Sequence, residues 1–288
     1  MKIYFNGKLV NSGKALISVF DHGLLYGDGV FEGIRTYGCL IFRMKEHIDR
    51  LYKSADAIEL KIPITKTKMI EAVVKTLKAN SLKNSYIRLV VTRGVGDLGL
   101  DPRKCRKPTI FIITDTIKLY PKEFYDRGLD IITAHTRRNY PKALDPRIKS
   151  LNYLNNILAK IDAIKAGTEE AIMLTCDGYV AECTGDNIFM VKNRELITPP
   201  VEIGALKGIT RDAAIGLAKL SNIPFYEKLL RMEDLYSAGE VFLTGTAAEI
   251  IPVIKIDKQR IGNGKPGEIT LKLMKEFREL TKVDGVRY

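Results

Sequence analysis

Lys149 and Tyr153 are residue types that could bring an amine and a phenol to one site. Lys149 lies just ahead of a helix that the apolar spacing predicts over residues 152–166, so Tyr153 would lie one helical turn beyond it. A neutral lysine amine can act as a nucleophile or accept a proton. A lysine at the boundary of an element is also commonly solvated, and the residue types alone leave both interpretations open.

Two segments have the composition of anion sites. Gly208 precedes Thr210, which we expect to cap a helix over residues 210–220, and backbone N–H groups at a helix start bind anions. Residues 241–249 form a predicted buried strand that runs into a turn of small residues, Gly245, Thr246 and Ala247. Either segment by itself is also typical of an ordinary helix or strand boundary.

Glu182 is a carboxylate in a short predicted strand, residues 179–183, with apolar neighbours. An exposed strand face would also explain a charged residue in this place. Glu182 is therefore a candidate that needs further support.

The first hundred residues predict strands and two helices. Asn6-Gly7 is a strong turn signal between short strands at 2–5 and 9–10. Alternation over 29–37 predicts a strand, which a second hairpin through Gly38-Cys39 follows. Apolar residues at helical spacing predict helices around 48–55 and 70–77. Strands at 86–93 and 110–114 flank a glycine-rich loop, residues 94–102. On the strand 29–37, the residues predicted to share one face are Phe31, Gly33, Arg35 and Tyr37.

The second half mixes strands and helices without a regular β-α-β period, which favours an α+β fold over a doubly wound sheet. We predict a strand at 131–134, a meander of strands at 171–175, 179–183 and 187–191, and a strand at 241–243. The pattern loosens around Pro121 and Gly128. This predicts a small N-terminal domain (1–118), a connection (119–128) and a larger C-terminal domain (129–288).

Composition excludes some classes of protein. With 288 residues, 45% hydrophobic and 28% charged, the chain is globular rather than disordered. The net charge of +12 attracts anions of any kind, but the basic residues form no long run and no nucleic-acid-binding pattern. Four cysteines without a CxxC pair predict neither a metal site nor disulfides. Without an apolar run long enough to span a membrane or a signal-peptide core, we expect a cytoplasmic protein.

Six separated motifs resemble, in order and spacing, the fold-type IV aminotransferases, the class IV family of enzymes that use pyridoxal 5'-phosphate (PLP). The resemblance implies a small and a larger α/β domain with the active site between them, and a homodimer or higher homo-oligomer. The motifs are residues 26–35, 47–51, Lys149 with 152–154, 182–187, 207–211 and 245–249.

Carried over residue by residue, the resemblance makes Lys149 the catalytic lysine that holds PLP covalently, and Glu182 the carboxylate that faces the pyridine nitrogen. Tyr153 would donate a hydrogen bond to the phenolic oxygen of PLP. An anionic partner is needed at the ring nitrogen because it keeps that nitrogen protonated at neutral pH. The residues that the resemblance places at the phosphate or beside it are Arg50, Ile209, Thr210, Gly245 and Thr246.

Within the family, Tyr86 and Arg88 resemble the pair by which branched-chain aminotransferases hold the distal carboxylate of glutamate. This implies transfer of the amino group of L-leucine, L-isoleucine and L-valine to 2-oxoglutarate, typical of branched-chain amino-acid biosynthesis. The amides of Thr246 and Ala247 would bind the α-carboxylate, and Leu100 would reach the neighbouring subunit's site. The other residues expected at the substrate are Tyr26, Phe31, Gly33 and Arg35.

Three alternatives stay open at this point. Residues 91–94 resemble those of D-amino-acid aminotransferases, and aminodeoxychorismate lyases share the fold. From a different class, a basic protein could bind anions or nucleic acid at the same helix ends without covalent chemistry.

Overall fold

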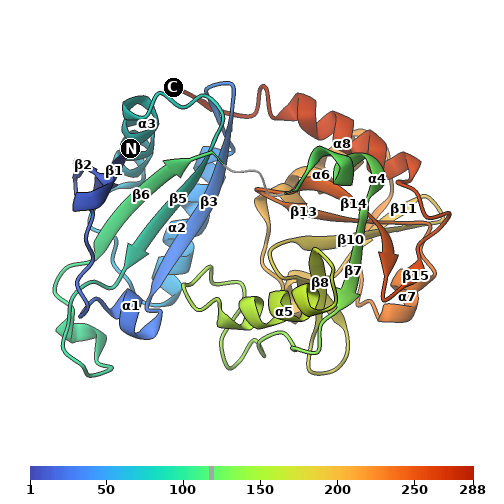
Figure 1. Ribbon diagram of the computed structural model, residues 1–288, viewed down its shortest axis with the longest axis horizontal. Coiled ribbons are helices and arrows are strands. Elements are labelled where there is room, and N and C mark those ends of the chain that lie inside the picture. Colours follow the sequence, from blue (N-terminus) through green and yellow to red (C-terminus); the bar gives the residue numbers. More distant parts are fainter. Residues whose placement is uncertain (117–119) are drawn as a thin grey trace. The chain divides into compact units, whose positions relative to one another are not determined.

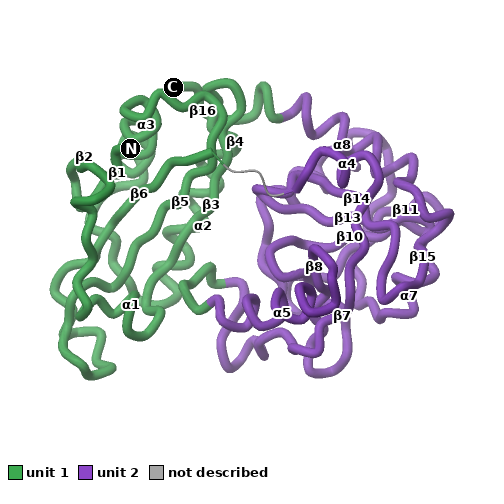
Figure 2. Tube along the Cα trace, viewed as in Figure 1, with its two compact units in different colours: residues 1–117, 148–152, 281–288 green, residues 118–147, 153–280 purple. Residues whose placement is uncertain are grey.

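The structure, a computed structural model, describes residues 1–116 and 120–288, and the chain divides into two compact units (Figure 1, Figure 2). Unit 1 contains Met1–Ile117, Ile148–Asn152 and Thr281–Tyr288. Unit 2 contains Lys118–Arg147 and Tyr153–Leu280. The chain therefore returns to unit 1 for a short segment in its middle and again at its end.

Unit 1 is built on one antiparallel sheet. Its strands are β1 (Lys2–Phe5), β2 (Lys8–Asn11), β3 (Gly29–Tyr37), β4 (Leu40–Phe42), β5 (Ser85–Thr92), β6 (Thr109–Asp115) and β16 (Gly285–Arg287). Its helices are α1 (His22–Tyr26), α2 (Met44–Ala57) and α3 (Lys66–Ala79), with 3-10 turns at Ser12–Lys14 and Pro102–Lys104. The strand order is β16-β4-β3-β5-β6-β1-β2, so β3 and β5 lie inside the sheet (Figure 1).

Both predicted hairpins of unit 1 are confirmed. Asn6 and Gly7 have φ values of 46° and 92°, and β1 pairs with β2 in the register that this tight turn sets. Gly38 and Cys39 form the second turn, between β3 and β4. The bounds of β3 match the alternation that predicted it.

Helices α2 and α3 pack their apolar sides on one face of this sheet. Ile48 and Leu51 of α2 are fully buried beside the inward-facing side chains of β3 and β5, such as Ile34 and Leu89. Burial of such side chains contributes about 1.5–3 kcal/mol each. The face of β3 that carries Val30 and Ile34 is therefore the core face, and the face that carries Phe31 is the opposite one.

The segment Ile148–Asn152 belongs to unit 1 because its backbone binds β3. The amide of Phe31 donates to the carbonyl of Lys149 over 3.0 Å, and the amide of Leu151 donates to the carbonyl of Gly29 over 2.9 Å. This pairing forms an isolated bridge between Val30 and Ser150. The segment is therefore not helical: Ser150 lies in the bridge, between bends at Ile148 and Leu151.

Unit 2 is a mixed sheet with helices. Its strands are β7 (Leu129–Thr133), β8 (Glu170–Leu174), β9 (Val180–Cys183), β10 (Asn187–Lys192), β11 (Glu195–Thr198), β12 (Phe225–Glu227), β13 (Glu240–Gly245), β14 (Glu249–Ile256) and β15 (Gln259–Arg260). Its helices are α4 (Lys122–Arg127), α5 (Leu154–Lys165), α6 (Ile209–Leu220), α7 (Met232–Tyr236) and α8 (Glu268–Leu280), with a 3-10 turn at Val201–Ile203. The strand order is β12-β11-β10-β13-β14-β7-β8-β9, with β15 on β14.

The predicted meander is wrong in one pairing. Strands β8 and β9 pair as expected, but β10 pairs with β11 and β13 instead of β9. Ile188 and Met190 of β10 are thereby buried beside Val241 and Leu243 of β13 in the core of unit 2. Non-local burial of apolar residues has overridden the nearest pairing in sequence.

The predicted boundary between residues 118 and 119 lies outside the described residues. Within the predicted connection 119–128, the structure has helix α4, which is part of unit 2. In the described ranges no helix is both long and apolar enough to span a membrane.

Candidate active site

One face of the β3-β5 pair carries five of the predicted substrate residues, Phe31, Gly33, Arg35, Tyr86 and Arg88. The register sets Gly33 opposite Arg88 and Arg35 opposite Tyr86, and paired residues of antiparallel strands point to the same side. The guanidinium carbon of Arg88 lies 4.5 Å from the centroid of the Phe31 ring and 5.5 Å from that of Tyr86. The structure thus places one cation over two aromatic rings on a face that α2 and α3 leave uncovered.

Gly33 has a steric reason to be glycine. A Cβ atom built on it would lie 2.0 Å from the hydroxyl oxygen of Tyr86. A larger residue would require the Tyr86 side chain to shift, so glycine leaves the space that the Tyr86 hydroxyl occupies.

Lys149 lies on the same face as Phe31. Its Nζ atom is 4.5 Å from the centroid of the Phe31 ring, and its backbone amide donates to the hydroxyl of Ser54 over 3.2 Å. Together with the bond from Phe31 N–H to the Lys149 carbonyl, these contacts fix the lysine backbone at the edge of β3. Lys149 as a residue is half-buried.

The expected helical turn between Lys149 and Tyr153 is wrong. Helix α5 begins at Leu154, and Tyr153 is its N-cap residue. The physical reason is the pairing of residues 149–151 with β3, which keeps them out of the helix. Lys149 is part of unit 1 and Tyr153 is part of unit 2.

Arg50 of α2 is held by a buried carboxylate that the sequence analysis did not assign. Its Nε and Nη2 atoms donate to the two oxygens of Glu32 over 2.7 and 2.8 Å, and His47 Nδ1 lies 2.7 Å from Glu32 Oε2. Glu32 lies on the core face of β3 and has no exposed surface. A bidentate pair of this kind fixes the orientation of a guanidinium.

Burial and pairing set the charges of Glu32, His47 and Arg50. Burial raises the pKa of Glu32, but Arg50 and His47 outweigh it and bring the pKa to about 2. Burial also lowers the pKa of His47, so the neutral ring donates its Nδ1–H to the carboxylate. Glu32 and Arg50 therefore form the charged pair, and His47 completes the hydrogen bonding.

We expect the Glu32 pair to make unit 1 acid-sensitive. A carboxyl whose pKa is lowered from its usual 4.5 to about 2 on folding stabilises the protein above about pH 4.5, and this contribution is lost as the pH falls toward 2. The shift corresponds to roughly 3 kcal/mol in the free energy of unfolding. The free energy of urea unfolding, measured at about pH 6 and about pH 3 for the protein and for Glu32→Gln, gives this contribution. Equal losses in both proteins would contradict the assignment.

The glycine-rich loop after β5 is tied to α1. The Tyr26 hydroxyl donates to the carbonyl of Leu98 over 2.5 Å, and His22 Nε2 lies 2.8 Å from the carbonyl of Asp97. Leu100, two residues beyond, has 79% of its surface exposed. Tyr26 thus positions the loop that presents Leu100.

Arg93 belongs to the residues that resemble D-amino-acid aminotransferases, and it is committed to the fold of unit 1. Its guanidinium donates to both oxygens of Asp28 over 2.8 and 3.0 Å and to the carbonyls of Glu59 and Ile58. Arg93 is buried, and these bonds tie the end of α2 to the strand. These bonds give Arg93 a structural role, and no role in the choice between L- and D-amino acids is needed to explain its presence.

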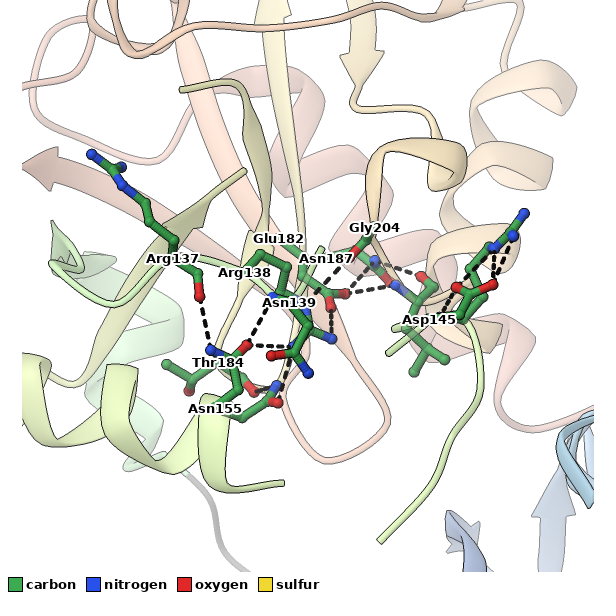
Figure 3. A network of polar contacts seen from close by, with 12 residues as sticks. Arg137, Arg138, Asn139, Asp145, Asn155, Glu182, Thr184, Asn187 and Gly204 are labelled. Atoms are coloured by element: carbon green, nitrogen blue, oxygen red, sulfur yellow. Dashed lines mark hydrogen bonds and ion pairs between the residues drawn. The ribbon is translucent and has the colours of Figure 1, made fainter. Parts of the chain in front are cut away.

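In unit 2, Glu182 is buried and ion-paired, so an exposed strand face does not explain it. Its Oε1 atom lies 2.7 Å from Nη2 of Arg138 (Figure 3). Its Oε2 atom accepts the backbone N–H of Leu206 over 2.9 Å and Nδ2 of Asn187 over 3.4 Å. Arg138 was not among the predicted site residues, since nothing local in the sequence links it to Glu182.

The N-terminus of α6 is free of a side-chain cap, as an anion site requires. The helix begins at Ile209, its N-cap is Gly208, and within the part of the chain that the structure describes it has no side-chain cap. Thr210 is inside the helix, so its predicted role as the cap is wrong. Because Gly208 takes that place, the first N–H groups are left for an anion.

The turn after β13 shows a second sign of a ligand. Near the end of β13, the hydroxyl of Thr244 is buried and has no hydrogen-bond partner among the described residues, and a Cβ atom on Gly245 would lie 1.7 Å from Oδ1 of Asp186. Thr246 and Ala247 follow as half-buried turn residues. An unpartnered buried hydroxyl, an uncapped helix start and a buried carboxylate all lie in unit 2, and they fit a cofactor with a phosphate and a basic ring nitrogen.

Comparison with known proteins decides the family. A family model described as amino-transferase class IV matches residues 29–256. A protein of Methanocaldococcus jannaschii, provisionally named a branched-chain-amino-acid aminotransferase, is 55% identical over 100% of this chain and 99% of its own. The chain belongs to the class IV aminotransferases.

Solved structures agree with this class IV assignment. Branched-chain amino acid aminotransferase of Escherichia coli is 36% identical, with a TM-score of 0.95 over 97% of this chain and 94% of its own. The branched-chain amino acid aminotransferase of Thermobaculum terrenum in its PLP form is 30% identical, with a TM-score of 0.88 over 97% and 93%. The predicted family, α+β fold, enzyme class and PLP chemistry are confirmed.

Proposed function

We propose that this aminotransferase moves the amino group of L-leucine, L-isoleucine or L-valine to 2-oxoglutarate, giving the branched-chain 2-oxo acids and L-glutamate. The proposal rests on the residues that lie together on the face of β3 and β5 opposite the core face. There Phe31 and Tyr86 offer an apolar surface to an aliphatic side chain, and Arg88 offers a guanidinium to a distal carboxylate. The same face can therefore bind both the branched-chain amino acid and the glutamate or 2-oxoglutarate.

PLP, when bound, supplies an electron sink for the bond that breaks at the substrate Cα. We assign Lys149 to hold the cofactor, to accept the Cα proton at Nζ once its amine is released, and to return that proton to the C4′ position. Its fixed backbone beside Phe31 supports this role, because a proton acceptor must be held within reach of one atom.

For the phosphate we assign Arg50, the amides of Ile209 and Thr210, and Thr246. The uncapped start of α6 supports the assignment of the two amides. The bidentate pair with Glu32 supports the assignment of Arg50, because it orients the guanidinium. Gly245 lets the chain turn close to the ligand.

The remaining roles complete the active site. Glu182 faces the pyridine nitrogen, and Tyr153 donates to the phenolic oxygen. The amides of Thr246 and Ala247 take the α-carboxylate, as small residues in a tight turn allow. Gly33, Arg35 and Tyr26 border the substrate side chain, and Leu100 reaches the neighbouring subunit's site; Gly33 leaves room for the Tyr86 hydroxyl, and Tyr26 holds the loop of Leu100.

Helix α5 supports the predicted homodimer. It buries its small residues, including Ala159 and Ala163, and exposes a row of larger apolar residues. The row consists of Leu154, Ile157, Leu158, Ile161 and Ile164, of which Leu154 and Ile164 are 67% and 64% exposed. A second copy of this chain is the occupant that we propose, since contiguous exposed apolar surface marks an interface. Cytoplasmic location and a biosynthetic direction stay predictions.

The deciding experiment compares amino donors with 2-oxoglutarate as acceptor. We expect turnover with L-leucine, L-isoleucine and L-valine and little with D-alanine. Before the assay, the yellow colour of the holoenzyme should be lost on borohydride reduction, with PLP fixed on Lys149 in the peptide map. Preference for D-alanine would favour the D-amino-acid alternative, and a colourless protein after reconstitution would favour binding without covalent chemistry.

We expect Arg50→Lys to weaken PLP retention more than catalysis at saturating PLP. Lysine keeps the charge near Glu32 but loses the bidentate geometry, which costs about 2 kcal/mol, or roughly thirtyfold in Kd. Equilibrium dialysis measures the Kd, with the exposed Lys53→Ala on the same helix as control. An unchanged Kd in Arg50→Lys would remove Arg50 from the phosphate site.

A further inference from the structure

Three groups of the protein donate hydrogen bonds to the carboxylate of Glu182. Arg138 donates to Oε1, while Leu206 N–H and Asn187 donate to Oε2. A carboxylate has about four acceptor positions, so three are used by the protein. The remaining position is on Oε1, the oxygen that Arg138 also binds.

The guanidinium of Arg138 is fixed independently of Glu182. Its Nε atom donates to the carbonyl of Gly204 over 3.2 Å, and Nη1 donates to Oδ1 of Asn155 and Asn156 over 3.2 and 3.0 Å (Figure 3). Its backbone amide donates to the carbonyl of Leu174 in β8 over 2.8 Å. The side chains of Arg138 and Glu182 are only 7% and 6% exposed. This arginine therefore acts as a rigid support rather than a mobile surface partner.

A buried carboxylate needs a charged or hydrogen-bonded partner, and Arg138 is such a partner for Glu182. An arginine is protonated throughout the physiological range, so its contact with Oε1 places a fixed positive charge beside this oxygen. If the arginine were absent, a proton shared between Glu182 and a ring nitrogen would lie closer to the carboxylate.

We propose that Arg138 is a positioning residue for Glu182, which presents Oε1 to the pyridine nitrogen and holds the shared proton on that nitrogen. The inference rests on the proposed function, and it assigns to this chain a residue that acts through Glu182. Asn155 and Asn156 at the start of α5 orient Arg138 and form the outer part of the same support.

The experiment compares Arg138→Met with Arg137→Met in the PLP-loaded enzyme. Arg137 is the adjacent arginine; its side chain is exposed and points away from Glu182 (Figure 3), so the control removes the same charge. The main readout is the nitrogen-15 chemical shift of PLP labelled at its ring nitrogen. We expect Arg138→Met to move this shift from the pyridinium toward the neutral pyridine value, and Arg137→Met to leave it unchanged.

Two further measurements accompany the shift. Infrared difference spectra should show a carboxylic-acid C=O band in Arg138→Met that Glu182→Gln in the same background removes. Single-turnover rates of Cα deprotonation should fall on the order of tenfold to a hundredfold, because the ring withdraws electrons less strongly. A folded Arg138→Met with a pyridinium shift and an unchanged rate would overturn the proposal.

Arg138→Lys covers the case in which Arg138→Met does not fold. Lysine keeps a cation at this place but cannot bind Gly204, both asparagines and Glu182 together. We expect a protonated ring nitrogen with a deprotonation rate several-fold below that of the unchanged enzyme at saturating PLP. An unchanged rate would mean that Arg138 serves stability alone. Absence of transamination in the unchanged enzyme would count against the proposed function, not against this inference.

Discussion

Replacing Lys149 with alanine is expected to reduce transamination by at least roughly a thousandfold while PLP still binds without a covalent link. The loss combines two effects, since on the proposed function the substitution removes both the group that holds the cofactor and the group that moves the Cα proton. The fold should persist, because the bonds that fix this segment run through the backbone of Lys149 and Leu151 to β3. Single-turnover kinetics with L-leucine measure the loss.

Lys142→Ala is the matched control, since Lys142 is an exposed lysine upstream of the same segment. A small primary amine added to Lys149→Ala should restore part of the rate, because it supplies a proton acceptor in the space that the side chain leaves. Near-normal turnover in Lys149→Ala without added amine would remove Lys149 from the mechanism.

Local rules predicted the sheet of unit 1 well. Asn6-Gly7 requires a turn with positive φ, and the alternation over 29–37 requires one buried face, so both elements follow from a few neighbouring residues. The same alternation places Glu32 on the core face, between Val30 and Ile34. A carboxylate on a core face needs a buried partner, and this signal could have identified the Glu32 pair with Arg50 from the sequence.

The errors arise where distant segments compete with local preference. A helix that starts near Asn152 is locally reasonable, but β3 offers backbone partners to residues 149–151 and keeps them out of a helix. Arg138 shows the same limit, because 44 residues of chain separate it from Glu182 and no spacing rule connects them. Pairings of this kind become visible only when strands and loops are packed.

A substitution of Arg88 tests whether this enzyme has the substrate range of a branched-chain aminotransferase. Strand β5 lies between β3 and β6, so Arg88 is not on a sheet edge, and in the described ranges no ion pair joins it to an acidic side chain. Its contacts are instead the rings of Phe31 and Tyr86. A half-buried guanidinium held over aromatic faces can direct its hydrogen-bond donors to a carboxylate, which is the role that we propose for Arg88.

We expect Arg88→Leu to raise the KM for glutamate and 2-oxoglutarate and to lower their kcat/KM by roughly tenfold to a thousandfold, the scale of a lost charged hydrogen bond. The leucine half-reaction should change much less, because an aliphatic substrate contacts the rings and not the guanidinium. Stopped-flow measurement of each half-reaction separates the two, with the exposed Arg103→Leu as a control for net charge. Equal losses for leucine and glutamate would mean that Arg88 supports the fold or the shared α-carboxylate site. The branched-chain assignment would then depend on the turn from Gly245 to Ala248 alone.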